Sequence, residues 1–561
     1  MPCLLLGPLL RHVDTSSATV WVETDSPCTV EVLGTSASTW RVGRHHYALV
    51  CVDGMEPGST TPYEVRLDGT RVWPDPASPY PPSRIRTVDA DRSFRLVFGS
   101  CRAAAPRSWT PASRFGADAL DTYAERLART PEQQWPDALL LLGDQVYADE
   151  TSPITQRRIR ARRDVSRPPY TQVADFEEYT YLYQETWSDP QLRWLLSTIP
   201  TSMIFDDHDV HDDWNTSQSW REDIAATTWW SERITGALMA YWIYQHLGNL
   251  APAALAVDQL YRNVCAAEDA EQTLREFARQ ADREADGAKG AQWSYRRDLG
   301  RCRLLVIDSR CGRILADARR SMLSEPEFGW IESQVDGDYD HLLIGTSLPW
   351  LLPPAIHDLE SSDEALCAGR RGRLLGRVAE RLRRAVDMEH WAAFRESFDR
   401  LARLLGRVAA GQYEGDRPPA TVCVLSGDVH HGYVARARYP EPAGREPAHG
   451  AVYQLVCSPV HQGVPRSMRF GFRLGWSRPA ELLGRLVARL ARLPAPPLSW
   501  DRVAGPFFGN QLATLTVDGR SVTVAFECAE PVDERSARLR QTAEVTLSPG
   551  AAVPTSMNAG R

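Results

Sequence analysis

The sequence is almost free of lysine. Lys289 is the only lysine among 561 residues, and every other basic residue is arginine. Mechanisms that need a Schiff-base lysine or a P-loop lysine elsewhere in the chain are therefore excluded. The sequence also lacks GxSxG, GxGxxG and HExxH motifs, which removes the support for a serine hydrolase, a dinucleotide enzyme or a zincin.

Paired cysteines are missing as well. The chain has 11 cysteines, an odd number, and none lies in a CxxC pair. This pattern argues against a disulfide framework and a structural zinc site, and it favours a reducing compartment. The first residues contain no basic segment, no small-residue cleavage site and no twin-arginine signal, so we expect no export signal and a cytoplasmic location.

Excess positive charge and long apolar runs are also scarce. A net charge of −8 and a pI near 6.0 give no reason to expect a nucleic-acid partner. One uncharged stretch, residues 236–257, approaches the length of a membrane span. Because it contains Gln245, His246, Asn249 and Pro252, we interpret it as a buried helix and expect no stable membrane span.

The order of the apolar patterns predicts a small all-β domain followed by an α/β domain. Residues 1–90 contain alternating apolar runs, and the Pro-rich residues 73–83 are expected to form a linker. From Phe94 onward, six short buried-strand runs are each followed by polar or acidic residues: FRLVFG, ALLLL, SMIF, RLLVI, HLLIG and TVCVLS. Ligands gather at the carboxyl ends of strands in open α/β sheets, so we expect these ends to converge on one site.

Helical insertions separate these strands. We expect helices over residues 227–250, 270–284 and 370–410; an apolar stripe in the last predicts a core-facing helix. Residues 467–500 are basic and amphipathic, which indicates an exposed arginine face, with contact to a membrane surface as the alternative. A hairpin near the C-terminus is expected to extend the main sheet, and residues 549–561 are expected to form a frayed tail.

Residues 202–215, SMIFDDHDVHDDWN, contain the highest density of potential metal ligands. In this segment an apolar run ends in carboxylates and two histidines. So many carboxylates at one strand end repel one another unless protons or metal ions neutralise them. Aspartate and histidine are suitable ligands for such ions. A solvated acidic loop is the alternative interpretation of this segment taken alone.

Three further loops after strands carry similar groups. GSCR places Cys101 just past a strand, and GDQVY offers Asp144 and Tyr147 three residues apart. GDVHHG offers Asp428 and His430 at alternate positions of an extended loop. Taken alone, Cys101 is typical of an inert buried cysteine. Together with the acidic loop, the set suits two metal ions bridged by an aspartate, with a metal-activated hydroxide as the nucleophile.

The set GSC, GDxxY, DDHD and GDxHxG, in this order, resembles the PhoD-like alkaline phosphatases of the metallophosphoesterase superfamily. The resemblance covers most of residues 91–548 and implies an α/β (α+β) four-layer core of two mixed sheets flanked by helices. Residues 1–90 resemble the fibronectin type III-like β-sandwich that these proteins often carry, on the runs at 18–22 and 58–63. The implied activity is metal-dependent hydrolysis of phosphate esters, as a phosphomonoesterase or phosphodiesterase.

The resemblance also implies two metal sites. The ligands of a ferric ion (Fe³⁺) would be Cys101, Asp144, Tyr147 and His430, with Asp144 as the bridging carboxylate. The ligands of a divalent ion would be Asp207, Asp212 and Asp428. Ca²⁺ is the ion that the family implies first, with Mn²⁺ or Zn²⁺ as alternatives. Family members commonly carry an asparagine where this chain has Asp212, which leaves the identity and number of the divalent ions open.

Further side chains have implied catalytic roles. His208 would protonate or stabilise the leaving group, and Asp209 would orient its ring. Arg102 would clamp two phosphate oxygens, with Arg310 in VIDSR as a second candidate. The superfamily's Gly-His motif after the next strand has no counterpart, because this chain has GTSLPW at residues 345–350.

Two other functions are compatible with the sequence. One is a phospholipase D-like hydrolysis of lipid phosphodiesters, suggested by the Trp-rich helix and the basic residues 473–492. The other is a catalytically weak metal-binding recognition protein; intact Cys101, Tyr147, His208 and His430 argue against it, since a degenerate site would have lost ligands. We expect small-molecule phosphoester substrates and leave the natural substrate, the pH optimum and the oligomeric state open.

Overall fold

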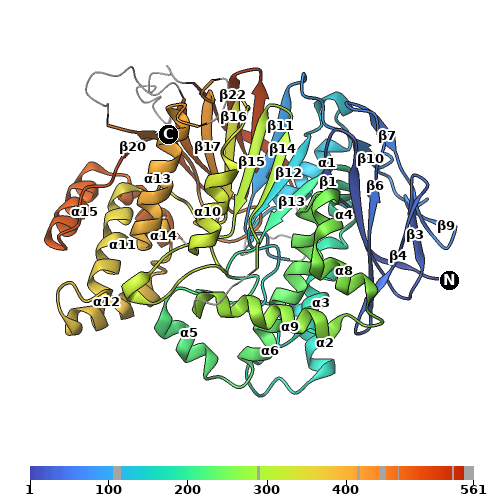
Figure 1. Ribbon diagram of the computed structural model, residues 1–561, viewed down its shortest axis with the longest axis horizontal. Helices are drawn as coiled ribbons and strands as arrows, with labels where there is room; N and C mark the ends of the chain where they lie inside the picture. Colours follow the sequence, from blue (N-terminus) through green and yellow to red (C-terminus); the bar gives the residue numbers. More distant parts are fainter. Residues whose placement is uncertain are drawn as a thin grey trace.

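The computed structural model describes residues 1–104, 115–286, 291–413, 417–440, 450–464, 466–533 and 536–548 (Figure 1). All six expected strands are present. They belong to two mixed sheets at the centre of the molecule, and helices lie on the outer sides of these sheets (Figure 1). The tail expected at residues 549–561 lies outside the described residues.

The first sheet has six strands in the order β13-β12-β11-β21-β22-β23. Their bounds are β11 (Phe94–Gly99), β12 (Ala138–Leu142), β13 (Thr201–Ile204), β21 (Gln511–Asp518), β22 (Ser521–Pro531) and β23 (Ala537–Leu547). β11, β12 and β13 are parallel, whereas β21 pairs antiparallel with β11. β21 and β22 are the expected hairpin, which extends the main sheet as predicted.

The second sheet has seven strands in the order β14-β15-β16-β17-β19-β18-β20. Their bounds are β14 (Tyr295–Leu299), β15 (Cys302–Ile307), β16 (His341–Thr346), β17 (Thr421–Ser426), β18 (Gly432–Arg438), β19 (Ala451–Val456) and β20 (Ser499–Phe507). β15, β16, β17 and β19 are parallel. The remaining pairings are antiparallel, so this sheet is mixed like the first.

Side chains that alternate between the two faces of β15 show that the two sheets pack face to face. Leu304 belongs to the apolar cluster shared with the first sheet, whereas Leu305 belongs to the cluster shared with the outer helices. Successive side chains of a strand point to opposite faces, so one face of this sheet contacts the first sheet. Gly345 in β16 lies at this contact, since a Cβ atom there would be 3.3 Å from Leu142. The expected four-layer core is therefore confirmed.

The N-terminal residues form the expected all-β domain, with two four-stranded sheets and a core of their own. Its strands are β1 (Leu4–Val13), β2 (Ala18–Thr24), β3 (Thr29–Val32), β4 (Thr35–Ser38), β5 (Trp40–Val42), β6 (His45–Val52), β7 (Thr60–Pro62), β8 (Val65–Leu67), β9 (Thr70–Trp73) and β10 (Arg84–Arg86). Because β10 pairs with β7, the Pro-rich residues 73–83 lie within this domain. The expectation of a linker there is wrong.

Helices fill the segments between the strands. The α-helices before the second sheet are α1 (Ala119–Leu127), α2 (Pro153–Arg162), α3 (Phe176–Trp187), α4 (Pro190–Thr198), α5 (Gln218–Ala225), α6 (Trp230–Ala240), α7 (Pro252–Val257), α8 (Gln259–Ala266) and α9 (Glu271–Asp282). Those that follow are α10 (Glu325–Gln334), α11 (Pro354–Cys367), α12 (Arg373–Ala385), α13 (Arg395–Ala409), α14 (Arg466–Gly475) and α15 (Arg478–Leu490).

Two expected helices are interrupted. In residues 236–257, a π-helical turn at Tyr241–His246 and a 3₁₀ turn at Leu247–Asn249 separate α6 from α7. Most of this stretch is buried, and within the described ranges no helix combines the length and the apolar character that a bilayer crossing requires. The single helix expected at residues 370–410 consists of α12 and α13, and the turn between them contains a short 3₁₀ helix at Trp391–Ala393.

Candidate metal centre

Four of the expected strand ends converge, and two glycines allow this. A Cβ atom at Gly143, after β12, would lie 2.5 Å from Asp206 Cβ, which follows β13. A Cβ atom at Gly427, after β17, would lie 1.9 Å from Ser100 Oγ, which follows β11. Any side chain at either position would overlap its neighbour in a close-packed interior, so both positions require glycine.

Four of the predicted metal ligands have a left-handed backbone. Their φ angles are +62° at Cys101, +52° at Asp144, +65° at Asp428 and +49° at His430. This conformation costs an L-residue about 1–2 kcal/mol. Such strain collects at functional sites, where the surrounding structure holds it in place. The backbone therefore supports a functional role for these loops.

In the described part of the chain, carboxylates and one histidine form three groups with donor atoms that lie within 4.8 Å of one another. The groups are Asp144, Asp206 and Asp207; Asp207, His208 and Asp212; and Asp207, Glu389 and Asp428. Asp207 belongs to all three groups, whereas Asp144, expected as the bridging ligand, belongs to one. A cation in either of the two groups made only of carboxylates would have three protein donors, and neighbouring cations would share Asp207.

The charges of these groups fit metal ions. Among the described residues, the buried oxygens Asp144 Oδ1 and Asp206 Oδ2 have no hydrogen-bond partner. Burial, together with the neighbouring carboxylates, raises the pKa of Asp144 and the pKa of Asp206 well above their usual value. Burial and Asp207 raise the pKa of Asp212, the most exposed of the set, to about 7. Bound cations would relieve this repulsion, so the residues present suit divalent or trivalent ions.

Cys101, Tyr147 and His430 lie beside these groups. Cys101 is buried, and its Sγ accepts a hydrogen bond from Ser458 Oγ at 3.3 Å. The Tyr147 hydroxyl donates to Asp144 Oδ2 at 3.4 Å. Burial lowers the pKa of His430 to about 4, so its imidazole is neutral, as a metal ligand must be. The donor set therefore combines a thiol, a phenol and an imidazole with carboxylates.

The Arg310 side chain lies on the buried side of the metal centre, among its carboxylates. Its side chain is fully buried, with Nη2 3.1 Å from Asp207 Oδ1 and Nη1 2.5 Å from Glu389 Oε2. Its Nε contacts Asp206. The guanidinium already neutralises carboxylates of the metal centre, which argues against the expected phosphate clamp; that role stays a prediction.

The Arg102 guanidinium is also held by carboxylates. Its Nε lies 2.8 Å from Asp118 Oδ2, its Nη2 3.3 Å from Asp121 Oδ1, and its Nη1 donates to the Thr186 carbonyl. Asp118 also caps the N-terminus of α1. The guanidinium holds α1 against the loop after β11, which argues against a phosphate clamp; that role stays a prediction.

His208 is oriented by Asp149, which the sequence did not single out. His208 Nδ1 lies 3.0 Å from both carboxylate oxygens of Asp149, and Nε2 lies 3.7 Å from Asp212 Oδ1. Although burial opposes the charged form, Asp149 and Asp207 raise the pKa of His208 well above its usual value. A charged imidazole held in this way can donate a proton to a leaving oxygen.

Asp209 has a different role from the one expected. Its carboxylate accepts hydrogen bonds from the backbone N–H groups of Asp144 at 3.0 Å, Gln145 at 3.2 Å, Val146 at 3.2 Å and Asp206 at 2.9 Å. His208 and Asp209 are adjacent in a turn, where their side chains have different partners: His208 contacts Asp149, and Asp209 accepts from backbone N–H groups. Asp209 fastens the GDQVY loop to the DDHD loop.

Replacing Asp209 should therefore cost stability. Asp209→Ala leaves four buried N–H groups without an acceptor, and each unsatisfied group costs about 1–3 kcal/mol. We expect the free energy of unfolding in urea to fall by about 3 kcal/mol or more in the metal-free protein. Asp53→Ala, at an exposed carboxylate of the N-terminal domain, is the control and should change it by less than about 0.5 kcal/mol. Equal losses would contradict this role.

Glu389 and His390 are site residues that the sequence analysis missed. They lie in the turn between α12 and α13, and Glu389 Oε2 contacts Arg310. His390 Nε2 lies 3.1 Å from Asp428 Oδ2, and its Nδ1 lies 2.8 Å from Glu360 Oε1 in α11. An acidic residue next to a histidine, at a break in an amphipathic pattern, is the signal that could have identified them.

A second acidic cluster, beside the loop after β15, should affect pH stability. Burial, Asp308 and Glu327 hold the pKa of Glu284 at about 8, above that of an unfolded chain. The folded protein therefore retains a proton that the unfolded chain releases, and stability falls as pH rises from about 4.5 to 8. Glu284→Gln should unfold at a higher temperature than the original chain at pH 8, and at the same temperature at pH 4. A gain of the same size at both values would contradict the assignment.

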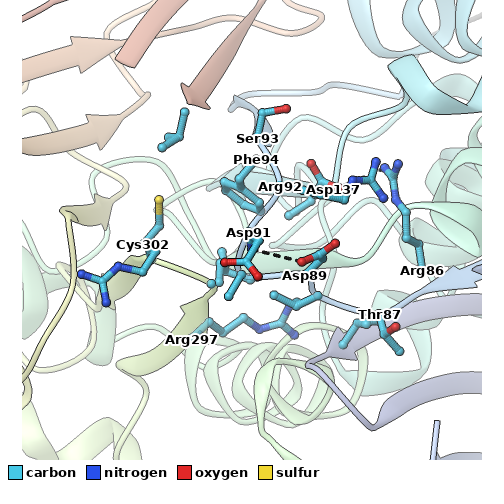
Figure 2. Close-up of a pocket in the computed structure, with 18 of the residues that line it drawn as sticks. Arg86, Thr87, Asp89, Asp91, Arg92, Ser93, Phe94, Asp137, Arg297 and Cys302 are labelled. Atoms are coloured by element: carbon cyan, nitrogen blue, oxygen red, sulfur yellow. Dashed lines mark hydrogen bonds and ion pairs between the residues drawn. The ribbon is translucent and has the colours of Figure 1, made fainter. Parts of the chain in front are cut away.

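The pocket in Figure 2, of about 100 Å³, is separate from this centre. Among its lining residues are Phe94, Ala138 and Cys302, the first residues of β11, β12 and β15. The candidate ligands follow the last residues of parallel strands, so the pocket lies at the opposite edge of the sheets. Figure 2 shows Asp89 and Asp91 within it.

Comparisons with known proteins agree with this geometry. A family model described as PhoD-like phosphatase matches residues 108–470, and one described as a domain of unknown function (DUF7800) matches residues 1–85. A search of curated proteins found no match. A solved structure titled "Structure of PhoD" is 12% identical, with a TM-score of 0.58 over 97% of this chain and 90% of that chain. The purple acid phosphatase PPD1 from yellow lupin (Lupinus luteus) seeds is 12% identical, with a TM-score of 0.48 over 96% of this chain and 74% of that chain.

Two mixed sheets pack face to face, and most of their strands, with the buried carboxylates at the strand ends, lie in the part of the molecule that the phosphatase model covers. The PhoD-like model covers more than half of the sequence, and the chain belongs to the PhoD-like phosphatase family. It is a metal-dependent hydrolase of phosphate esters, as its motifs predicted. The structural match to PhoD confirms the fold. The fibronectin type III-like character of the N-terminal domain and the domain boundaries stay predictions.

Proposed function

We propose that this chain hydrolyses small-molecule phosphate esters with one ferric ion and one divalent ion, Ca²⁺ in the first place. The ferric ligands would be Cys101, Asp144, Tyr147 and His430. The divalent ligands would be Asp207, Asp212 and Asp428. The observation that carries the proposal is the set of three donor groups that share Asp207. A thiol and a neutral imidazole beside Asp144 favour a transition-metal ion over Ca²⁺ on that side, and the phenol favours a strongly Lewis-acidic one such as Fe³⁺.

The metal ions would supply Lewis acidity and a deprotonated water near neutral pH. The chain's own residues would do the rest. His208, held by Asp149, would give a proton to the leaving alkoxide. Arg310 and His390 would keep the carboxylates of Asp207 and Asp428 in position from the buried side. No phosphorylated residue is needed in this scheme.

Elemental analysis of the purified protein tests the metal assignment. We expect about one iron per chain, a second metal, and a visible absorbance band from tyrosinate bound to iron. Treatment with a chelator should abolish the band and the hydrolysis of nitrophenyl esters, and iron with calcium should restore both. Tyr147→Phe is the spectroscopic control, since it should lose the band in the iron-loaded protein. Absence of metal, with no activity after iron and calcium are supplied, would contradict the proposal.

The ratio of monoester to diester hydrolysis in the same assay gives the preferred substrate class. Phospholipase D-like activity is the second candidate, and comparing lipid vesicles with soluble esters discriminates it. Family membership favours catalysis over a metal-binding recognition protein. The cytoplasmic location stays a prediction.

A further inference from the structure

Two helices at one end of the molecule carry the same motif. α12 contains Leu-Leu-Gly-Arg at residues 374–377, and α15 contains it at residues 482–485. Both helices pack on α11, at the end away from the N-terminal domain (Figure 1). A Cβ atom at Gly376 would lie 3.1 Å from the Leu366 carbonyl oxygen, and one at Gly484 would lie 3.1 Å from Ala355 Cα. Each glycine therefore turns the same side of its helix toward α11.

The opposite side of each helix presents aliphatic side chains to solvent. On α12 these are Leu374, Leu375, Val378 and Leu382; on α15 they are Leu482, Leu483, Leu486 and Leu490. Their exposed fractions range from 48% to 77%. At about 100° per residue, the spacing i, i+1, i+4 and i+8 gives one row on each helix, directed away from the glycine.

A third copy of the motif shows what such a row does when it is covered. In α13, Leu404, Leu405 and Val408 follow the same pattern. They are buried against the second sheet. Within the ranges that the structure describes, no segment covers the corresponding rows of α12 and α15. Two exposed rows of four aliphatic residues on neighbouring helices are uncommon on a soluble surface and indicate a binding face.

Arginines line one side of both rows. Arg373, Arg377 and Arg381 of α12 are exposed, as are Arg478, Arg485 and Arg489 of α15. Arg377 and Arg485 directly follow the two glycines, and Arg381 and Arg489 lie four residues further on; Glu481 stands in α15 where α12 has Arg373. Arg371, just before α12, donates to the carbonyl of Leu490 at the end of α15, so the start of α12 lies beside the end of α15. The face is basic although the chain carries a net charge of −8.

We propose that the α12–α15 face docks on an anionic lipid bilayer. Its leucines would enter the boundary between headgroups and acyl chains, and its arginines would pair with lipid phosphates. An apolar row flanked by arginines is the anatomy of helices that lie in this boundary, and negative lipids complement the basic side. A second copy of the chain fits less well, because a two-fold contact would place arginine rows of like charge together.

Sedimentation of the full chain with lipid vesicles tests this proposal. The original chain should bind vesicles of phosphatidylcholine with phosphatidylglycerol, and should bind pure phosphatidylcholine at least tenfold more weakly. Leu375→Glu with Leu483→Glu should weaken anionic binding at least tenfold. Arg377→Gln with Arg485→Gln should weaken it and reduce its salt dependence. Val257→Glu, at a 72% exposed valine on α7, is the matched control and should bind like the original chain.

Hydrolysis of a soluble nitrophenyl ester and the unfolding temperature should be unchanged in all these variants, which shows that they are folded. The proposal does not depend on the metal assignment, because a chain without metal would still bind vesicles. Failure of the original chain to bind anionic vesicles would overturn it, as would equal binding by the leucine variant. A dimer in solution that dissociates in the leucine variant would assign the face to a second copy instead.

Discussion

Asp144→Asn should abolish hydrolysis while leaving the metal-free protein at least as stable as before. The substitution keeps the shape of the side chain but removes the negative charge that the proposed ferric site needs. Loss of one preorganised electrostatic contact typically costs about 10²–10³-fold in rate. Loss of a metal ligand should cost more, so we expect activity to fall below detection and iron content to fall with it.

The stability of the same variant separates a metal ligand from a structural residue. Asp144 Oδ1 has no hydrogen-bond partner among the described residues, and its carboxylate lies among Asp206, Asp207 and Asp209. A neutral amide removes this repulsion, so the free energy of unfolding without metal should stay equal or rise. Glu150→Gln makes the same change at an exposed position nearby and should alter neither property. Retained activity in Asp144→Asn would show that the proposed ligand is misplaced.

His208→Ala should slow hydrolysis in a way that depends on the leaving group. A positioned general acid contributes about 10²–10⁴-fold when the leaving oxygen must be protonated. Hydrolysis of alkyl phosphate esters, which release a poor alkoxide leaving group, should therefore be slowed by about that factor. Nitrophenyl esters leave as stable anions and should be slowed far less. The measurement is kcat for a series of esters of increasing leaving-group pKa.

Two variants control this experiment. His211→Ala removes the other histidine of the same loop, which stacks on Trp229. Any slowing by this substitution should be the same for all esters in the series. Asp149→Asn should lower the pKa of His208, since that carboxylate raises it, and should shift the alkaline limb of the pH–rate profile to lower pH. Equal slowing of all esters by His208→Ala would contradict the proposed acid role.

The fold was predictable from the sequence because its signals are local. Each catalytic strand is a short apolar run, and each is followed directly by its motif, as in residues 202–215. The strand runs and the motifs come in the order that the sheets require. Glycines such as Gly427 mark the positions where two such loops touch.

The partners of the charged residues were not predictable, because they depend on contacts between distant segments. Asp209 adjoins His208 in sequence, yet Asp149, 59 positions away, makes the contact. Arginine is the residue type expected for a phosphate clamp. Only the packing shows that carboxylates already hold Arg102 and Arg310. A continuous apolar stripe also concealed the turn that brings Glu389 and His390 to the site.

The two glycines between the loops set a limit on how this enzyme can change. Neither Gly143 nor Gly427 carries a functional group, yet a methyl group at either one would push apart the loops that hold the ligands. If both positions are replaced by all other residues and the variants are scored for activity, few or none should remain active. Exposed positions of the same loops should accept many residues. Engineering of new substrate preference should therefore keep both glycines fixed, together with Glu389 and His390 in the turn between α12 and α13.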